Sequence, residues 1–138
     1  QGIVAAVQWL ANGFEQRSGV TTQVRSSAAT IALSADIQLV AYRTAQEALT
    51  NAAKHAHAQA IQIDIADTGG VFTLEISDDG CGMEDGAPKK AKSFGLRGLR
   101  ERAKTVDGWL DVSSRAGEGT SIILSVPLHH SSEEENTP

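Results

Sequence analysis

The chain has little of what marks several common protein classes. It contains a single cysteine, which excludes an internal disulfide framework and is typical of a reducing compartment. No run of apolar residues approaches the roughly 18–20 that a membrane-spanning helix needs. The opening QGIVAAVQWL lacks the basic start and the cleavage pattern of a signal peptide. Twelve Lys and Arg against 17 Asp and Glu give a net charge of −5, which argues against a general nucleic-acid binder.

What remains is an ordinary composition for a globular protein. Its 138 residues suit one domain with a single core, and 41% of them are hydrophobic. The sequence begins abruptly inside an apparent helix, so we expect it to be a fragment of a longer protein.

Apolar residues spaced three and four apart predict three helices. They cover residues 3–17, residues 34–55 with Ser34 as the N-cap, and a short basic segment at residues 96–106. Apolar residues that alternate predict strands. The strand segments read VTTQV, IQIDIA, VFTLEIS, WLDVSS and TSIILSVPL. The mixture predicts an α+β fold, a two-layer sandwich with helices on one face of a mostly antiparallel sheet.

Two segments show neither the helical nor the strand spacing of apolar residues. Residues 83–94 contain glycine, proline and three lysines and are predicted to be a mobile loop. Residues 129–138 are polar and acidic and are predicted to be disordered, so the domain would cover residues 1–128. Seven of the twelve basic residues lie between Lys89 and Lys104. They indicate either a solvated helix face beside a loop or a local site for a polyanion.

Polar residues on the second helix are candidates for chemistry. Glu47, Asn51 and Lys54 are spaced to share one side of an α-helix, which we expect to point away from the alanine-rich face; His55 borders it. A carboxylate, an amide and an ammonium in line suit a hydroxyl, a hard metal ion and a phosphate. Glu and Lys are also common on solvated helix surfaces, so this set is not specific alone.

The segment Asp78-Asp79-Gly80-Cys81-Gly82 follows a predicted strand. A carboxylate there can accept a hydrogen bond from an exocyclic amine, and the glycines allow a flat ligand to approach the backbone. The alternatives are an ordinary turn and a calcium loop, but the further acids that a calcium loop needs are missing.

Two glycine pairs complete the set of motifs. Gly95 and Gly98 open the basic helix, where backbone N–H groups and the helix dipole favour phosphate. Gly117-Glu118-Gly119-Thr120 joins the last two strands, either as a plain hairpin turn or as bare backbone and a hydroxyl beside a ligand.

The order of these motifs resembles the N, G1, G2 and G3 boxes of the GHKL ATPase superfamily. Within it, YRTAQEALTNAAKHAHA and FGLRGLRERA are similar to the catalytic ATP-binding (HATPase) domain of sensor histidine kinases that phosphorylate NarL/LuxR-type response regulators. The resemblance covers roughly residues 2–128. It implies the Bergerat fold, three helices on a mixed sheet, and ATP and Mg²⁺ as ligands.

The resemblance also implies a role for each motif. Asp78 would accept from the adenine amino group, with Asp79 the less favoured acid. Asn51 would bind Mg²⁺, Lys54 or His55 would hold the phosphates, and Glu47 would be the catalytic base or orient a hydroxyl. Residues 83–94 would be the ATP lid. The remaining nucleotide-binding positions would be Gly80, Gly82, Gly95, Leu96, Gly98, Leu99, Gly117, Gly119 and Thr120.

By the same resemblance the chain is the catalytic half of a protein-histidine kinase. Its phosphoacceptor histidine would lie on a separate dimerisation domain, and its phosphoryl group would pass to a response regulator. We expect a monomeric, cytoplasmic part of a possibly membrane-anchored kinase, with no nucleic-acid partner and no membrane contact of its own. The alternatives are an ATP-controlled binding module without phosphoryl transfer, an ATP-hydrolysing clamp, and an interaction domain with fortuitous glycines.

Overall fold

Five strands form one mixed sheet in the computed structural model, which describes residues 2–56, 58–80, 96–115 and 118–128. The strand order is β1-β2-β3-β5-β4. Only β1 runs parallel to its neighbour; the other three pairings are antiparallel. The strands are β1 (Thr21–Ser26), β2 (Ala60–Thr68), β3 (Val71–Asp78), β4 (Trp109–Arg115) and β5 (Gly119–Pro127).

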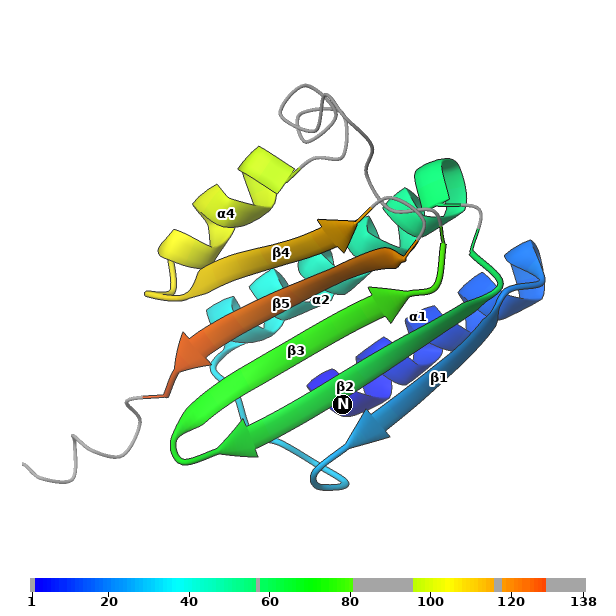
Figure 1. Ribbon diagram of the computed structural model, residues 1–138. Helices are drawn as coiled ribbons and strands as arrows, with labels where there is room; N and C mark the ends of the chain where they lie inside the picture. The colour runs from blue at the N-terminus through cyan, green and yellow to red at the C-terminus, as the bar shows by residue number, and fades with distance from the viewer. Residues whose placement is uncertain (1, 57, 81–95, 116–117, 129–138) are drawn as a thin grey trace, which may run out of the picture.

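Helices cover one face of this sheet and leave the other face open (Figure 1). They are α1 (Ile3–Ser18), α2 (Ala35–Asn51), the π-helical turn η1 (Ala52–Ala56) that continues α2, and α4 (Leu96–Lys104). The predicted two-layer α+β sandwich is therefore confirmed. None of the helices in the described ranges is long and apolar enough to cross a membrane.

Local sequence signals explain where the elements end. α1 stops at Gly19, whose φ of 78° is left-handed and whose N–H donates to the Glu15 carbonyl. Gly69 and Gly70 both have positive φ, 62° and 81°, which gives the β2–β3 hairpin a turn that matches the strand twist. Ser34 is the N-cap of α2 as predicted, but its hydroxyl donates to Asp36 Oδ1 at 2.5 Å instead of capping an amide.

The core lies between the helix layer and the sheet. Alternate residues of the central strands point into it, and Phe72, Leu74 and Leu124 are fully buried there. Small residues of α2, such as Ala41 and Ala45, are also fully buried, so this helix lies close to the sheet. The core fixes the register of β3 against β5, and that register places the polar residues at the strand ends.

Candidate functional site

Asp78 and Thr120 face each other at one end of the sheet, where β3 ends and β5 begins. Asp78 continues the alternation of the buried residues Phe72, Leu74 and Ile76, so it lies on the side of the sheet that the helices cover. It is half-buried, and its Oδ1 accepts a hydrogen bond from Gly80 N at 2.8 Å. The carboxylate thus lies at the edge of the core instead of in solvent.

The surroundings of Asp78 shift its acidity. Burial raises the pKa of its carboxyl, and the backbone N–H groups of Gly80 and Thr120 partly offset this by stabilising the charged form. The nearby charge of Asp79 raises the pKa further. Among the described residues, no cation forms an ion pair with Asp78. A half-buried carboxylate of this kind gains from a ligand that donates a hydrogen bond to it.

Gly119 brings β5 against the end of β3. Its φ is 91°, and a Cβ at this position would lie 2.0 Å from the Asp78 carbonyl oxygen. Only glycine therefore fits here, for reasons of both backbone conformation and space. The next residue, Thr120, shares a hydrogen bond of 2.9 Å with the Ser114 hydroxyl on β4. The hydroxyls of Thr120 and Ser114 are thereby held beside Asp78.

Asp79 has a different task from Asp78. Its Oδ1 accepts from the backbone N–H groups of Gln59 and Ala60, at 2.9 and 3.0 Å, where β2 begins. These hydrogen bonds lower the pKa of Asp79, first that to Ala60 and then that to Gln59. The carboxylate ties the exit of β3 to the entry of β2. Sequence reasoning missed this role, because Gln59 lies twenty residues away and no local pattern marks it.

A shallow cavity of about 230 Å³ runs along this end of the sheet. Asp78, Ser114, Gly119 and Thr120 line it, together with residues of the open face. A second and larger cavity lies elsewhere, at the opposite ends of α2, α4 and β5. Of the predicted site residues, Asp78, Gly119 and Thr120 line the smaller cavity, whereas Glu47, Asn51, Lys54 and Gly98 do not.

The structure alters the picture of the α2 residues. Asn51 is only 7% exposed, whereas a polar side of α2 that points away from the alanine-rich face would ordinarily lie in solvent. The reason is that α2 contacts both α1 and α4, so its flank is covered as well as its base. Glu47 is half-buried and Lys54 is exposed.

The π-helical turn η1 changes the direction in which position 54 faces relative to Glu47 and Asn51. The predicted α-helix to residue 55 ends at Asn51, and Ala52–Ala56 continue with the wider hydrogen-bond spacing of a π-helix. Each residue then turns the chain by less than in an α-helix. Position 54 therefore no longer lies on the side of the helix that Glu47 and Asn51 share, and the backbone position of residue 55 lies closer to that side. The side chain of His55 lies outside the described part of the structure.

The residues of the glycine-opened helix separate into two kinds. Leu96 and Leu99 are 2% and 4% exposed and belong to the hydrophobic core, where they anchor α4. Gly98 is exposed, and a Cβ there would meet nothing within 4 Å. Gly80 is buried beside Asp78. Gly82, Gly95, Gly117 and the predicted lid 83–94 lie outside the described residues, so their roles stay predictions.

The donor set fits a nucleotide with a divalent cation. The Asn51 amide oxygen is the hard ligand that Mg²⁺ accepts, and Mg²⁺ usually takes one or two protein ligands together with phosphates and waters. No group of three or more His, Cys, Asp or Glu side chains in the described ranges is suited to hold a metal by itself. A cation at Asn51 would thus need oxygens from a ligand, which phosphates provide.

Known proteins match this chain in sequence. The family model described as histidine kinase-, DNA gyrase B- and HSP90-like ATPase matches residues 36–130. The histidine-protein kinase/phosphatase DegS of Brevibacillus brevis is 31% identical over 127 residues, which are 92% of this chain and 33% of that protein. The oxygen sensor histidine kinase NreB of Staphylococcus carnosus is also 31% identical, over 92% of this chain and 37% of its own length. The chain thus spans about a third of these relatives.

A solved structure supports the fold. The histidine kinase domain of the blue-light activated histidine kinase from Erythrobacter litoralis EL346 superposes with a TM-score of 0.79, at 19% identity. The match covers 94% of this chain and 62% of the other. The predicted resemblance to the ATP-binding domain of histidine kinases is confirmed by the sequence matches. This chain belongs to the family of histidine kinase-, DNA gyrase B- and HSP90-like ATPases.

Proposed function

We propose that this chain binds ATP with Mg²⁺ and donates the γ-phosphoryl group to a histidine on a separate dimerisation domain of the same kinase. The phosphoryl group then passes to a response regulator of the NarL/LuxR type. Family membership and the two histidine kinase relatives support the proposal. The observation that carries it is the half-buried Asp78 carboxylate, with its raised pKa, opposite Thr120.

Asp78 forms the adenine end of this site. Its carboxylate accepts a hydrogen bond from the exocyclic amine of the base, which offsets the cost of its partial burial. Gly80 lies buried beside it and offers its backbone to the ring, and Gly82, which lies outside the described residues, is proposed to have the same role. The hydroxyl of Thr120, positioned by Ser114, borders the same space. Gly119, with Gly117 before it, allows β5 to start this close to Asp78.

The end of α2 and the start of α4 form the phosphate end. Asn51 contributes its amide oxygen to the cation, and Lys54 or His55 holds the phosphates. The first turn of an α-helix has N–H groups without a partner inside the helix and a positive dipole end, so the start of α4 favours negative charge, with Gly95 and Gly98 giving close access. Leu96 and Leu99 act here by packing, since their burial fixes the angle of α4. The predicted ATP lid, residues 83–94, lies outside the described residues.

Glu47 is the candidate catalytic residue. It lies one helical turn before Asn51 on α2 and is half-buried. Its proposed role is to orient or deprotonate the accepting imidazole. Mg²⁺, when bound, neutralises charge on the transferring phosphoryl group. The protein's own part is otherwise to position the donor, which is the main demand of phosphoryl transfer.

The accepting histidine is not expected within this chain. Its four histidines are His55, His57, His129 and His130, and none stands in the sequence context of a phosphoacceptor. The isolated chain should therefore bind ATP with Mg²⁺, remain a monomer in the cytoplasm and show little autophosphorylation.

Two measurements test the proposal. Calorimetry with ATP and ADP, with and without Mg²⁺, should show binding of both nucleotides and stronger ATP binding with the cation. Labelled ATP should transfer phosphate to a supplied dimerisation domain, and Glu47→Gln should abolish transfer while nucleotide affinity stays within about twofold. Asp111→Asn, on the open face, is the matched control that keeps both. Binding without transfer by the wild type would instead favour an ATP-controlled binding module.

A further inference from the structure

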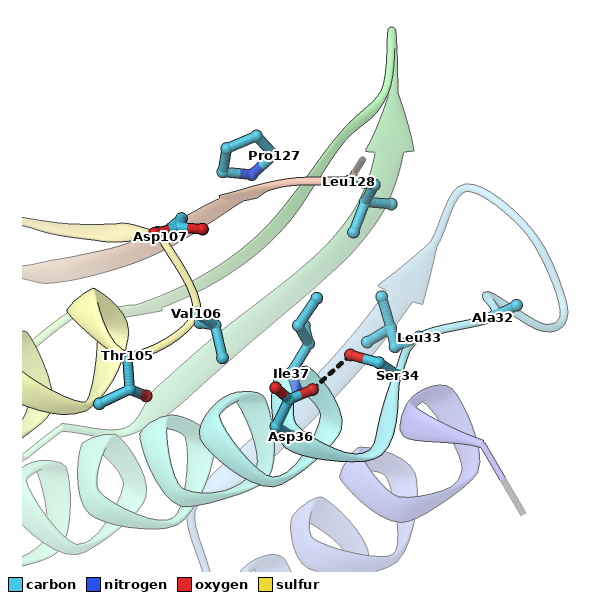
Figure 2. A pocket seen from close by; sticks show the side chains of 10 residues that line it. All are labelled: Ala32, Leu33, Ser34, Asp36, Ile37, Thr105, Val106, Asp107, Pro127 and Leu128. Carbon is cyan, nitrogen blue, oxygen red and sulfur yellow. Dashed lines mark hydrogen bonds between the residues drawn. The ribbon is translucent and has the colours of Figure 1, made fainter. Parts of the chain in front are cut away.

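A second cavity, of about 580 Å³, lies at the opposite end of the helix layer from Asp78. We name it the distal pocket. It is formed by the loop before α2, the first turn of α2, the turn after α4 and the end of β5 (Figure 2). Its lining residues are Ala32, Leu33, Ser34, Asp36, Ile37, Thr105, Val106, Asp107, Pro127 and Leu128. This volume falls within the range of small-molecule sites, roughly 300–1,000 Å³.

The wall of the distal pocket is apolar, and its side chains are partly exposed to solvent. Leu33, Ile37, Val106 and Leu128 are only partly buried and pack against the edge of the core. Figure 2 shows their side chains directed into the space between α2 and the end of β5. Half-exposed aliphatic side chains around a hollow gain free energy when an apolar body fills it.

The charged side chains among the residues that line the distal pocket are all acidic. The ten lining residues include the carboxylates of Asp36 and Asp107 and no Lys, Arg or His. Asp36 comes from the first turn of α2 and Asp107 from the turn after α4, so the acids approach from two sides (Figure 2). The single ion pair found among the described residues, Arg25 with Asp64, lies elsewhere on the sheet.

Asp36 is held in its charged form. The Ser34 hydroxyl donates to its Oδ1, as does the Ile37 N–H at 3.0 Å. Its pKa is lowered, chiefly by the hydrogen bond from Ser34. Both bonds use the same oxygen, Oδ1, of the carboxylate.

Asp107 occupies a position that favours glycine. It follows α4 with a φ of 63°, the only positive φ among the described non-glycine residues. Gly108 N donates to the Ala103 carbonyl and Asp107 N to that of Lys104, the two bonds of a helix C-terminal motif that usually has glycine at this place. The motif therefore carries a carboxylate at the rim of the distal pocket where glycine is conformationally easier.

We propose that the distal pocket binds a small amphipathic cation, with its apolar body against Leu33, Ile37 and Val106 and its ammonium or guanidinium group at the rim that carries Asp36 and Asp107. The proposal is independent of the nucleotide site and of the kinase function. The choice of a cation rests on the two carboxylates and on the fact that the described lining residues include no basic side chain.

Nuclear magnetic resonance of the whole 138-residue chain tests this with two probes of equal chain length, n-octylammonium and n-octanoate, below their micelle concentrations. We expect saturable shifts at the amides of residues 33–37 and 106–108 with octylammonium, and binding at least about fivefold tighter than that of octanoate. One charge pair about 4 Å apart in water accounts for roughly a fivefold factor. Equal affinity for the two probes, or shifts that do not saturate, would overturn the proposal.

Variants sharpen the test. Asp36→Asn and Asp107→Asn should each weaken octylammonium several-fold and leave octanoate no weaker; asparagine also tolerates the left-handed backbone at position 107. Asp111→Asn, the same change on the open face, should alter neither. Val106→Thr, a change of one apolar group to a hydroxyl at equal shape, should weaken both probes alike. If the chain ending at residue 128 binds octylammonium ten times more tightly, the segment after Leu128 is the natural occupant and the proposal fails.

Discussion

Replacing Asp78 with asparagine should separate ligand binding from fold stability, because the two respond in opposite directions. The carboxylate is half-buried, and burial raises its pKa. The folded state therefore binds a proton on Asp78 more tightly than the unfolded state does. Its stabilising contribution is fully present below the unfolded pKa and is lost as the pH rises through the folded pKa. At pH 7 the charge opposes folding, and Asp78→Asn removes that charge.

The expected loss of nucleotide affinity follows from the hydrogen bond that is changed. A bond to a charged group is worth about 1.5–3 kcal/mol, so ATP and ADP should both bind about 10- to 100-fold more weakly. The amide oxygen of asparagine can still accept from Gly80 N, so the local turn should persist. The melting temperature of the nucleotide-free variant should equal or exceed that of the wild type.

Asp79→Asn is the matched control, with the same change one residue along. Its carboxylate accepts from Gln59 N and Ala60 N, and those bonds lower its pKa. Its contribution to stability is present above the unfolded pKa and lost as the pH falls through the folded pKa. The variant should lose about 1 kcal/mol at neutral pH, discounted for the exposure of the group, and keep nucleotide affinity within about twofold.

Calorimetry with ADP and thermal unfolding without nucleotide, both at pH 7, measure the two effects on the same samples. The ADP affinity of the wild type should also fall when the pH is lowered towards the pKa of Asp78, which lies above the 3.8 of an unperturbed aspartate. The affinity of Asp78→Asn should not show this fall. If Asp79→Asn loses more affinity than Asp78→Asn, the assignment of the adenine ligand is refuted. A melting temperature of Asp78→Asn well below the wild type would refute the stability argument.

Three further outcomes are expected. Gly119→Ala should destabilise the fold by about 2 kcal/mol or more, since the added Cβ would lie 2.0 Å from the Asp78 carbonyl oxygen at a left-handed φ. Chemical denaturation measures this loss of stability, and an unchanged unfolding midpoint would contradict it. Gly98→Ala should stabilise by up to about 1 kcal/mol, because a helix position with open space gains from alanine. If ATP affinity nonetheless falls in Gly98→Ala, the phosphates approach the backbone there, whereas unchanged affinity removes Gly98 from the site. Lys54→Ala should weaken ATP more than ADP if the exposed ammonium meets the γ-phosphate; equal effects would leave position 55 as the phosphate contact.

The sequence predicted the elements well because short-range periodicity determines which residues face the core. Alternation in IQIDIA and VFTLEIS and the spacing of Ile3, Val7 and Leu10 each report a buried face directly. The parallel pairing of β1 with β2 was not predicted, since that contact joins residues about 39 apart in the chain, as between Thr21 and Ala60. Long-range pairing depends on the whole packing arrangement and has no local signal.

Asp78, Gly119 and Thr120, which the sequence motifs predicted to share a pocket, line one cavity, but the surroundings of the two acids had no local signal. Asp78 and Asp79 are alike in sequence, but successive residues of a strand point to opposite sides. Asp78 is the last residue of β3 and lies on the covered side of the sheet, whereas Asp79 follows the strand and accepts hydrogen bonds from Gln59 N and Ala60 N at the start of β2, which only the pairing of β2 with β3 reveals. The burial of Asn51 was not predicted, because the spacing of apolar residues along a helix marks one buried face, whereas α2 contacts both α1 and α4.

The two ends of the domain share three elements. α2 begins beside the distal pocket at Ala35 and ends at Asn51; α4 begins at Leu96 and ends before Asp107; β5 begins at Gly119 and ends at Pro127. Any ligand at one end that shifts these elements must change affinity at the other, and by linkage the factor is the same in both directions. The octylammonium affinity measured with and without ADP therefore decides between two descriptions of the helix layer. Equal affinities mean that α2 and α4 are held rigidly by their buried faces, while a reciprocal change means that they move as one unit between the two sites.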